Sequence, residues 1–180
     1  DSRWKDDVSP LPVDGTRLVF VNGVFDSSAS DDVPAEVTLF TQANAEQRQV
    51  IEANLGRMID VERHMFAALS NAWAEEGVLL HVPRNTTLDK PLYVVNVSTA
   101  QEQPAVASSR LLVVLETGAQ AELIEHYVST TVEQNGFVNA QTEVSVGANA
   151  RLRHSRINLE QENLLHVGGV YAELQRDANL

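Results

Sequence analysis

The amino-acid sequence predicts a mainly β protein, a parallel β-helix (solenoid) with coils of about 29–30 residues, preceded by a small α/β segment. Two observations support this fold class. Helical patterns are confined to the residues before Gly77, and beyond it a stretch of alternating residues recurs at a regular spacing. The recurring positions are Leu115, Thr117, Ala119, Ala121 and Leu123, then Val144, Val146, Ala148, Ala150 and Leu152, a step of about 29 residues.

Alternation with a period of two indicates strands, and its recurrence indicates that each strand lies about 4.8 Å from its predecessor. The small alanines fit a narrow interior between two sheets. A further step of about 30 residues reaches the last residues, which predicts two inward columns: Ala119, Ala148 and Ala178, and Leu115, Val144 and Leu174. An antiparallel sandwich is the alternative, but sandwich strands usually recur every 8–12 residues or so.

The α/β segment is expected to cover residues 1–77, and the solenoid residues 78–180. Residues 16–21 and 24–25 flank Asn22-Gly23, a strong hairpin signal because both turn residues need positive φ. Residues 37–40 form a further short strand. Two helices follow, at about 45–55 with Asn44 as its cap and at about 62–76. We expect the apolar face of the second to cover the first coil, through Met65, Phe66, Leu69 and Trp73.

The composition argues against several classes of function. The chain has 180 residues, a formal net charge of −12 and no cysteine. Without thiols it offers no disulfide framework, no thiolate zinc site and no cysteine-ligated iron–sulfur binding of its own. Its acidity argues against nucleic acid as a partner. No apolar run approaches about 18 residues and no leader pattern is visible, so we expect a cytoplasmic protein without membrane contact.

Five histidines are candidate metal ligands, although packing is favoured for each because none has a ligand spacing: His64, His81, His126, His154 and His166. Glu125 and His154 form the one candidate metal or structural pair, because their separation equals the repeat spacing and places them on neighbouring coils. The apolar Val128 and Ile157 break the alternation and predict a corner in the chain. Whether Glu125 faces inward is left open.

Catalytic motifs are missing from the sequence, so no catalytic or cofactor-binding residue is assigned. There is no nucleophile elbow, and residues 147–150 lack the lysine and helix of a phosphate loop. Arg151 and Arg153 share a strand face and form a candidate anion site. Asp89 and Lys90 are a second charged pair. A solvated outer face is the favoured interpretation of these charges.

Several stretches resemble the SufB/SufD family. Residues 68–72 (ALSNA), residues 77–83 (GVLLHVP) and Pro91-Leu92 resemble its opening helix, strand and Pro-Ile. Residues 110–129 and 139–160 resemble its first β-helix coils. The early hairpin and the absence of cysteine are closer to the SufD branch than to SufB, which is the cysteine-bearing scaffold.

The resemblance implies a right-handed β-helix and a non-catalytic scaffold subunit of the SufBCD complex, which assembles iron–sulfur clusters. It implies that SufC is the ATPase, that the subunit supports iron acquisition, and that the cluster belongs to the complex rather than to this chain. SufB and SufC would be contacted mostly through regions beyond residue 180. A β-solenoid carbohydrate-active enzyme or binding module is the alternative.

The repeat stops at Leu180, which predicts an open edge at the last coil. We expect a partner, further residues or self-association to cover this end of the solenoid.

Overall fold

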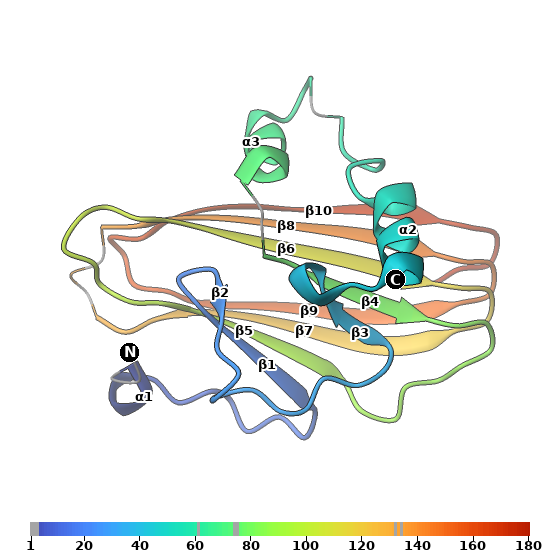
Figure 1. Cartoon of the computed structure of the whole chain (residues 1–180), viewed down its shortest axis with the longest axis horizontal. Helices are drawn as coiled ribbons and strands as arrows, with labels where there is room; N and C mark the ends of the chain where they lie inside the picture. Colours follow the sequence, from blue (N-terminus) through green and yellow to red (C-terminus); the bar gives the residue numbers. More distant parts are fainter. Residues whose placement is uncertain (1–3, 61, 74–75, 132, 134) are drawn as a thin grey trace.

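The computed structural model describes residues 4–60, 62–73, 76–131, 133 and 135–180, which form two facing five-stranded sheets (Figure 1). The parallel strands from β4 onwards alternate between the sheets along the chain, so it winds into a solenoid of about three turns. The predicted mainly β solenoid with a small α/β segment is confirmed. Sheet A contains, in spatial order, β2 (Val24–Phe25), β1 (Thr16–Val21), β5 (Leu92–Ser98), β7 (Gln120–Ser129) and β9 (Arg151–Leu159). Sheet B contains β10 (Leu165–Leu174), β8 (Phe137–Val146), β6 (Val106–Leu115), β4 (Val78–Val82) and β3 (Val37–Leu39).

The first strands extend both sheets at one end of the solenoid. β1 pairs in parallel with β5, and the hairpin places β2 antiparallel to β1. Asn22 and Gly23 have φ values of 51° and 84°, the positive values that the hairpin signal predicts. β3 pairs antiparallel with β4. The N-terminal segment therefore contributes strands to the solenoid sheets themselves.

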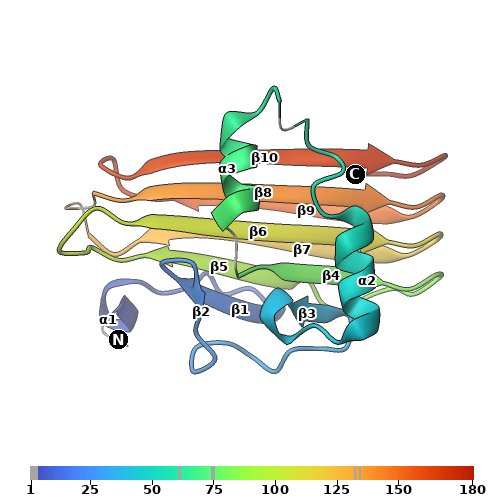
Figure 2. The ribbon, with the colours of Figure 1, turned by 45° about the horizontal axis from the view of Figure 1, so that its top comes forward.

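Two helices cross the outer face of sheet B (Figure 2), namely α2 (Ala45–Asn54) and α3 (Met65–Trp73). The predicted cap of α2 is confirmed: the Asn44 side chain accepts from the Gln47 N–H, and the Gln47 side chain accepts from the Asn44 N–H, both at 2.9 Å. The expectation that the helices cover the first coil is wrong, since α3 packs on β6, β8 and β10. The side chain of Trp73 lies outside the described part of the structure.

Polar groups on sheet B explain why the helices lie there. Arg110 and Glu143 form a buried ion pair of 2.5 Å on this face. Glu143 also accepts hydrogen bonds from the backbone N–H groups of Gly56 and Met58, at 2.8 and 3.2 Å. A buried ion pair needs such additional partners to offset its desolvation. The connection between α2 and α3 supplies them and is thereby fixed across the sheet.

The two sheets enclose a continuous apolar core, which includes Leu18, Leu80, Val113, Leu123, Val144 and Leu152. A second cluster lies on the outer face of sheet A, where the lead-in with α1 (Trp4–Asp7) covers Tyr93, Val95 and Val97. None of the described helices is long and apolar enough to cross a membrane.

Similar turns recur once per coil at one end of the strands. Asn85, Gly118, Asn149 and Asp177 occupy equivalent turn positions and have positive φ values of 57°, 71°, 59° and 57°. The residue after each one donates its N–H to the carbonyl three positions earlier, at 3.0–3.1 Å. A positive φ at the third position with this hydrogen bond is typical of a type II turn, which favours Gly or Asn there. These turns mark equivalent positions in successive coils.

The middle residue of each predicted inward column is wrong. Val146 and Ala150 occupy these positions, two residues (one pleat) after the predicted Val144 and Ala148. Leu115 lies beside Val146, which lies beside Leu174, and Ala119 lies beside Ala150, whose other neighbour is Ala178. A uniform step of 29 residues would place Gly147 in the turn position of Gly118, whereas Asn149 occupies that position. Gly147 has another role, because a Cβ there would lie 2.8 Å from the backbone of the preceding coil.

Candidate functional site

A polar cluster interrupts the apolar core between the sheets. Glu125 and Tyr127 on β7 follow Leu123 on the inward face, and Thr142 on β8 lies on the opposite wall. His154 and Arg156 extend inward from β9, the last strand of sheet A. Glu125 and Thr142 are completely buried. The cluster therefore places a carboxylate in the interior of the solenoid.

Four donors surround the Glu125 carboxylate. Oε1 accepts from Thr142 Oγ1 at 2.8 Å and from His154 Nε2 at 2.6 Å. Oε2 accepts from the Tyr127 hydroxyl and from Arg156 Nη2 at 3.2 Å. An ionised carboxylate only accepts, so His154 Nε2 carries a proton. The same Arg156 nitrogen donates to the Ala140 carbonyl at 3.2 Å, and the guanidinium lies 5.1 Å from the Tyr127 ring centre.

The surroundings keep the Glu125 carboxylate and the Tyr127 phenol in fixed protonation states. Burial alone would raise the pKa of Glu125, but the hydrogen bond from His154 and the charge of Arg156 outweigh it and hold the pKa below its usual value. Burial raises the pKa of the Tyr127 phenol, and the adjacent carboxylate raises it further. Tyr127 therefore remains a hydrogen-bond donor and Glu125 remains an anion at neutral pH.

The structure brings Glu125 and His154 together, as their spacing predicts, but in a different register. Glu125 lies directly opposite Arg156, and Leu123 lies opposite His154, so the contact is diagonal. The predicted corner is wrong, because β7 and β9 run unbroken through Val128 and Ile157. Val128 packs on the outer face of sheet A. The alternation therefore continues, and Glu125 faces inward.

The arrangement suits an ion-pair network better than a cation site. Each oxygen of Glu125 already accepts two hydrogen bonds, and the positive charge of Arg156 lies against the carboxylate. Among the residues that the structure describes, no group of three or more acidic or histidine side chains is placed to hold a metal ion. The chemistry that the cluster supports is charge stabilisation inside the fold.

The other histidines are dispersed over the molecule. His166 bonds to Glu160 at 2.6 Å and contacts Tyr127 edge-on with 4.8 Å between ring centres, which extends the polar cluster. His81 bonds to Glu116 at 3.0 Å. The remaining two contact tyrosines: His126 bonds to the buried Tyr93 hydroxyl at 2.7 Å, and His64 packs on the Tyr171 ring.

The remaining charged candidates lie on outer surfaces. Arg151 and Arg153 do share a face of β9, and Arg153 forms an exposed ion pair with Glu122 at 3.6 Å. Lys90 pairs with Asp14 at 2.7 Å, while Asp89 is exposed. These pairings account for the charges of Arg153 and Lys90 on the outer surface.

Sequence reasoning missed Tyr127, Thr142 and the pairing role of Arg156. The signal for Arg156 was present, because the step from Gly118 to Asn149, which occupy equivalent turns, also relates Glu125 to Arg156. Thr142 belongs to the opposite sheet, and a repeat within one sheet carries no information about the facing wall. The buried Arg110–Glu143 pair was missed for a similar reason. The pair is buried because the helical segment packs on that face of sheet B, and the repeat carries no information about where the helices pack.

The edges at the far end of the solenoid are open within the described residues. Sheet B ends in β10, and sheet A ends in β9, which is followed only by a single bridge to Asn179. Apolar side chains gather here and are exposed: Leu159, Leu165, Val170, Leu174 and Leu180. Unpaired strand edges with apolar neighbours are typical of surfaces that pair with further strands.

These features define a parallel β-solenoid protein with an internal ion-pair network. A family model described as the SufBD protein N-terminal region matches residues 5–94, and one described as the SufBD core domain of the SUF system for FeS cluster assembly matches residues 96–180. The chain belongs to the SufBD family. The resemblance seen in its motifs is thus confirmed.

Curated relatives agree with this membership. An iron–sulfur cluster assembly SufBD family protein of Synechocystis is 30% identical over 163 residues, which cover 84% of this chain and 36% of the relative. The iron–sulfur cluster assembly protein SufD of Escherichia coli is 28% identical, covering 86% of this chain and 35% of its own length. SufD of Bacillus subtilis is 26% identical, and the match covers 68% of this chain and 28% of that protein. The chain spans about a third of the length of these relatives.

Proposed function

We propose that this chain is part of a SufD-type scaffold subunit of a SufBCD complex, which assembles iron–sulfur clusters and supports iron acquisition. The observation that carries the proposal is the match of two consecutive SufBD family models to almost the whole chain, together with relatives named SufD in two bacteria. In this proposal the subunit works in the cytoplasm and is not an enzyme by itself.

The chemistry of the chain supports a scaffold role. Its 180 residues include no cysteine, so it has no thiolate with which to ligate a cluster, and the cluster would be held at the level of the complex. Its sequence has no phosphate loop, and ATP hydrolysis would belong to SufC. SufB and SufC would be bound largely by regions beyond residue 180.

The interior network supplies a physical reason why this segment would suit a scaffold. Each coil of a solenoid contacts only its neighbours, so its rigidity depends on links between coils. Glu125 links β7 to β9 through His154 and Arg156, and it links the two sheets through Thr142. A rigid stack of this kind would hold its partner proteins at a fixed distance from one another.

Co-expression of the complete subunit, with the regions beyond residue 180 included, and the SufB and SufC proteins of the same source tests the proposal. With an affinity tag on this protein, we expect SufB and SufC to co-purify in constant proportion through gel filtration. A parallel preparation with the tag on SufC is the control, since it shows whether SufB and SufC are folded and associate. Absence of this protein from an intact SufB–SufC assembly would contradict the proposal.

A further inference from the structure

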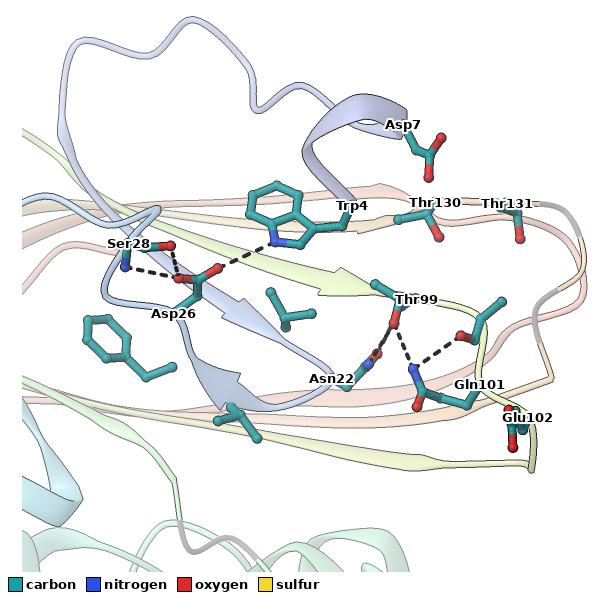
Figure 3. A pocket seen from close by; sticks show the side chains of 14 residues that line it. Trp4, Asp7, Asn22, Asp26, Ser28, Thr99, Gln101, Glu102, Thr130 and Thr131 are labelled. Atoms are coloured by element: carbon teal, nitrogen blue, oxygen red, sulfur yellow. Dashed lines mark hydrogen bonds between the residues drawn. The ribbon is translucent and has the colours of Figure 1, made fainter. Parts of the chain in front are cut away.

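A groove of about 870 Å³ lies at the end of the solenoid where the lead-in and the β1–β2 hairpin meet the segments that follow β5 and β7 (Figure 3). Its floor is partly aromatic, since Trp4 and Phe25 line it, and its walls carry the hydroxyls of Ser28, Thr99 and Thr130. Val24, at the rim, is 61% exposed although it is apolar. The groove is separate from the polar cluster around Glu125.

The charge of the groove is negative. Asp7, Asp26 and Glu102 line it from three different segments, and none of the described lining residues is Lys or Arg. Asp26 accepts from the Ser28 N–H at 2.9 Å, from the Ser28 hydroxyl at 2.6 Å and from Trp4 Nε1 at 3.4 Å. The hydrogen bonds from Ser28 lower the pKa of Asp26, so this carboxylate keeps its charge.

One cation of the chain itself already lies at the rim. Lys5 Nζ donates to the Ser28 hydroxyl at 3.3 Å and lies 5.7 Å from the centre of the Trp4 ring. A hydroxyl, an aromatic face and a nearby carboxylate together make a favourable environment for an ammonium group. The described lining of the groove gives Asp7 and Glu102 no basic partner, so the site holds fewer cations than carboxylates.

The opposite wall is preorganised. The Asn22 side chain donates to Thr99 Oγ1 at 2.7 Å and accepts from the Thr99 N–H at 2.9 Å, while Gln101 Nε2 donates to the same hydroxyl at 2.8 Å. These bonds tie the segment after β5 to the hairpin tip (Figure 3). A binding partner would therefore lose little free energy in ordering this wall.

We propose that this groove binds a basic segment, rich in Lys or Arg, of a partner protein. Charge complementarity is the reason for this choice: long basic side chains bring both an apolar stem for Val24 and Phe25 and a cationic head for Asp7 and Glu102. Phosphate-bearing partners are disfavoured by the same carboxylates. This interaction is independent of the association with SufB and SufC proposed above.

A fluorescein-labelled peptide of alternating Lys and Val tests the proposal by anisotropy at low ionic strength. We expect saturable binding that Asp7→Asn with Glu102→Gln weakens about fivefold, as two exposed ion pairs would. The control is Glu46→Gln with Glu52→Gln on α2, which changes the net charge equally but lies on the outer side of sheet B. That variant should bind within about twofold of the unmodified protein.

A second comparison separates the groove from general attraction to an acidic protein. Lys5→Ala removes the cation already at the rim and should tighten binding, whereas Lys90→Ala removes an equal charge from an exposed pair with Asp14 and should change it less. Absence of binding would overturn the proposal. Equal effects of the groove variants and their matched controls would overturn it too, because attraction would then follow net charge alone.

Discussion

At the scale of single residues, the molecule shows how a buried carboxylate can be retained in an apolar core. Glu125 is tolerated because four donors surround it, two of them on the next coil. Its pairing with His154 could be predicted from the repeat. Its opposite neighbour Arg156 follows from the step between the equivalent turn residues Gly118 and Asn149, but not from the repeat of the inward residues, which appears one pleat (two residues) shorter at this strand pair.

Replacing the carboxylate should destabilise the protein strongly. In Glu125→Gln, the amide nitrogen would face donors that now bond to an acceptor, and Arg156 would lose its counter-charge. Removing one partner of a buried pair typically costs about 3–5 kcal/mol. Urea unfolding measures the effect. The control is Glu122→Gln on the same strand, whose ion pair with Arg153 is exposed and should cost about 0–1 kcal/mol.

The stabilisation by Glu125 should depend on pH in a defined direction. Its pKa in the folded protein is lowered from the ordinary 4.5, so its contribution is fully present above that value and is lost as the pH falls through the folded pKa. The difference in unfolding free energy between the unmodified protein and Glu125→Gln should therefore narrow below about pH 4.5. A difference that stays constant down to about pH 3 would contradict the account.

At the scale of strands and turns, local sequence signals were sufficient to predict the individual elements. They were not sufficient to predict how the elements lie relative to one another. The Asn22-Gly23 hairpin, the Asn44 cap and the strands of the repeat follow from short-range chemistry and could all be predicted. The register needed the turn residues: Asn85, Gly118, Asn149 and Asp177 share a backbone conformation but not a residue type. The position of α2 and α3 depends on the buried Arg110–Glu143 pair, which has no periodic signature in the sequence.

The corrected register predicts opposite outcomes at two neighbouring alanines. Ala150 is completely buried in the inward column, so Ala150→Leu should overpack the interior and cost about 1–3 kcal/mol. Ala148 lies in the turn and is half-buried, so Ala148→Leu should change stability by less than about 0.5 kcal/mol. Thermal unfolding of both variants measures the difference. A larger loss of stability in Ala148→Leu than in Ala150→Leu would contradict the corrected register and support an inward column through Ala148.

At the scale of the whole described fold, the stack of coils is covered on its sides, and at one end the last strands of both sheets have no neighbouring strand among the described residues. The lead-in covers sheet A, the helices cover sheet B, and β2 and β3 lie at the first edges of the two sheets (Figures 1 and 2). β9 and β10 lie at the other edges, with exposed apolar side chains beside them. Self-association through these edges stays a prediction. The composition of both sheets and of their edges depends on the register in which neighbouring coils stack.

Disulfide cross-linking on the outer face of sheet A tests that alignment most directly, because the chain has no cysteine of its own. Glu122 lies opposite Arg153, about 4.8 Å away across the strands, whereas Arg151 is offset to roughly 8 Å. A disulfide requires Cα atoms less than about 7 Å apart. After mild oxidation of dilute protein, Glu122→Cys with Arg153→Cys should form an intramolecular disulfide, and Glu122→Cys with Arg151→Cys should stay reduced. Cross-linking of the second pair in preference to the first would contradict the stacking described for this solenoid.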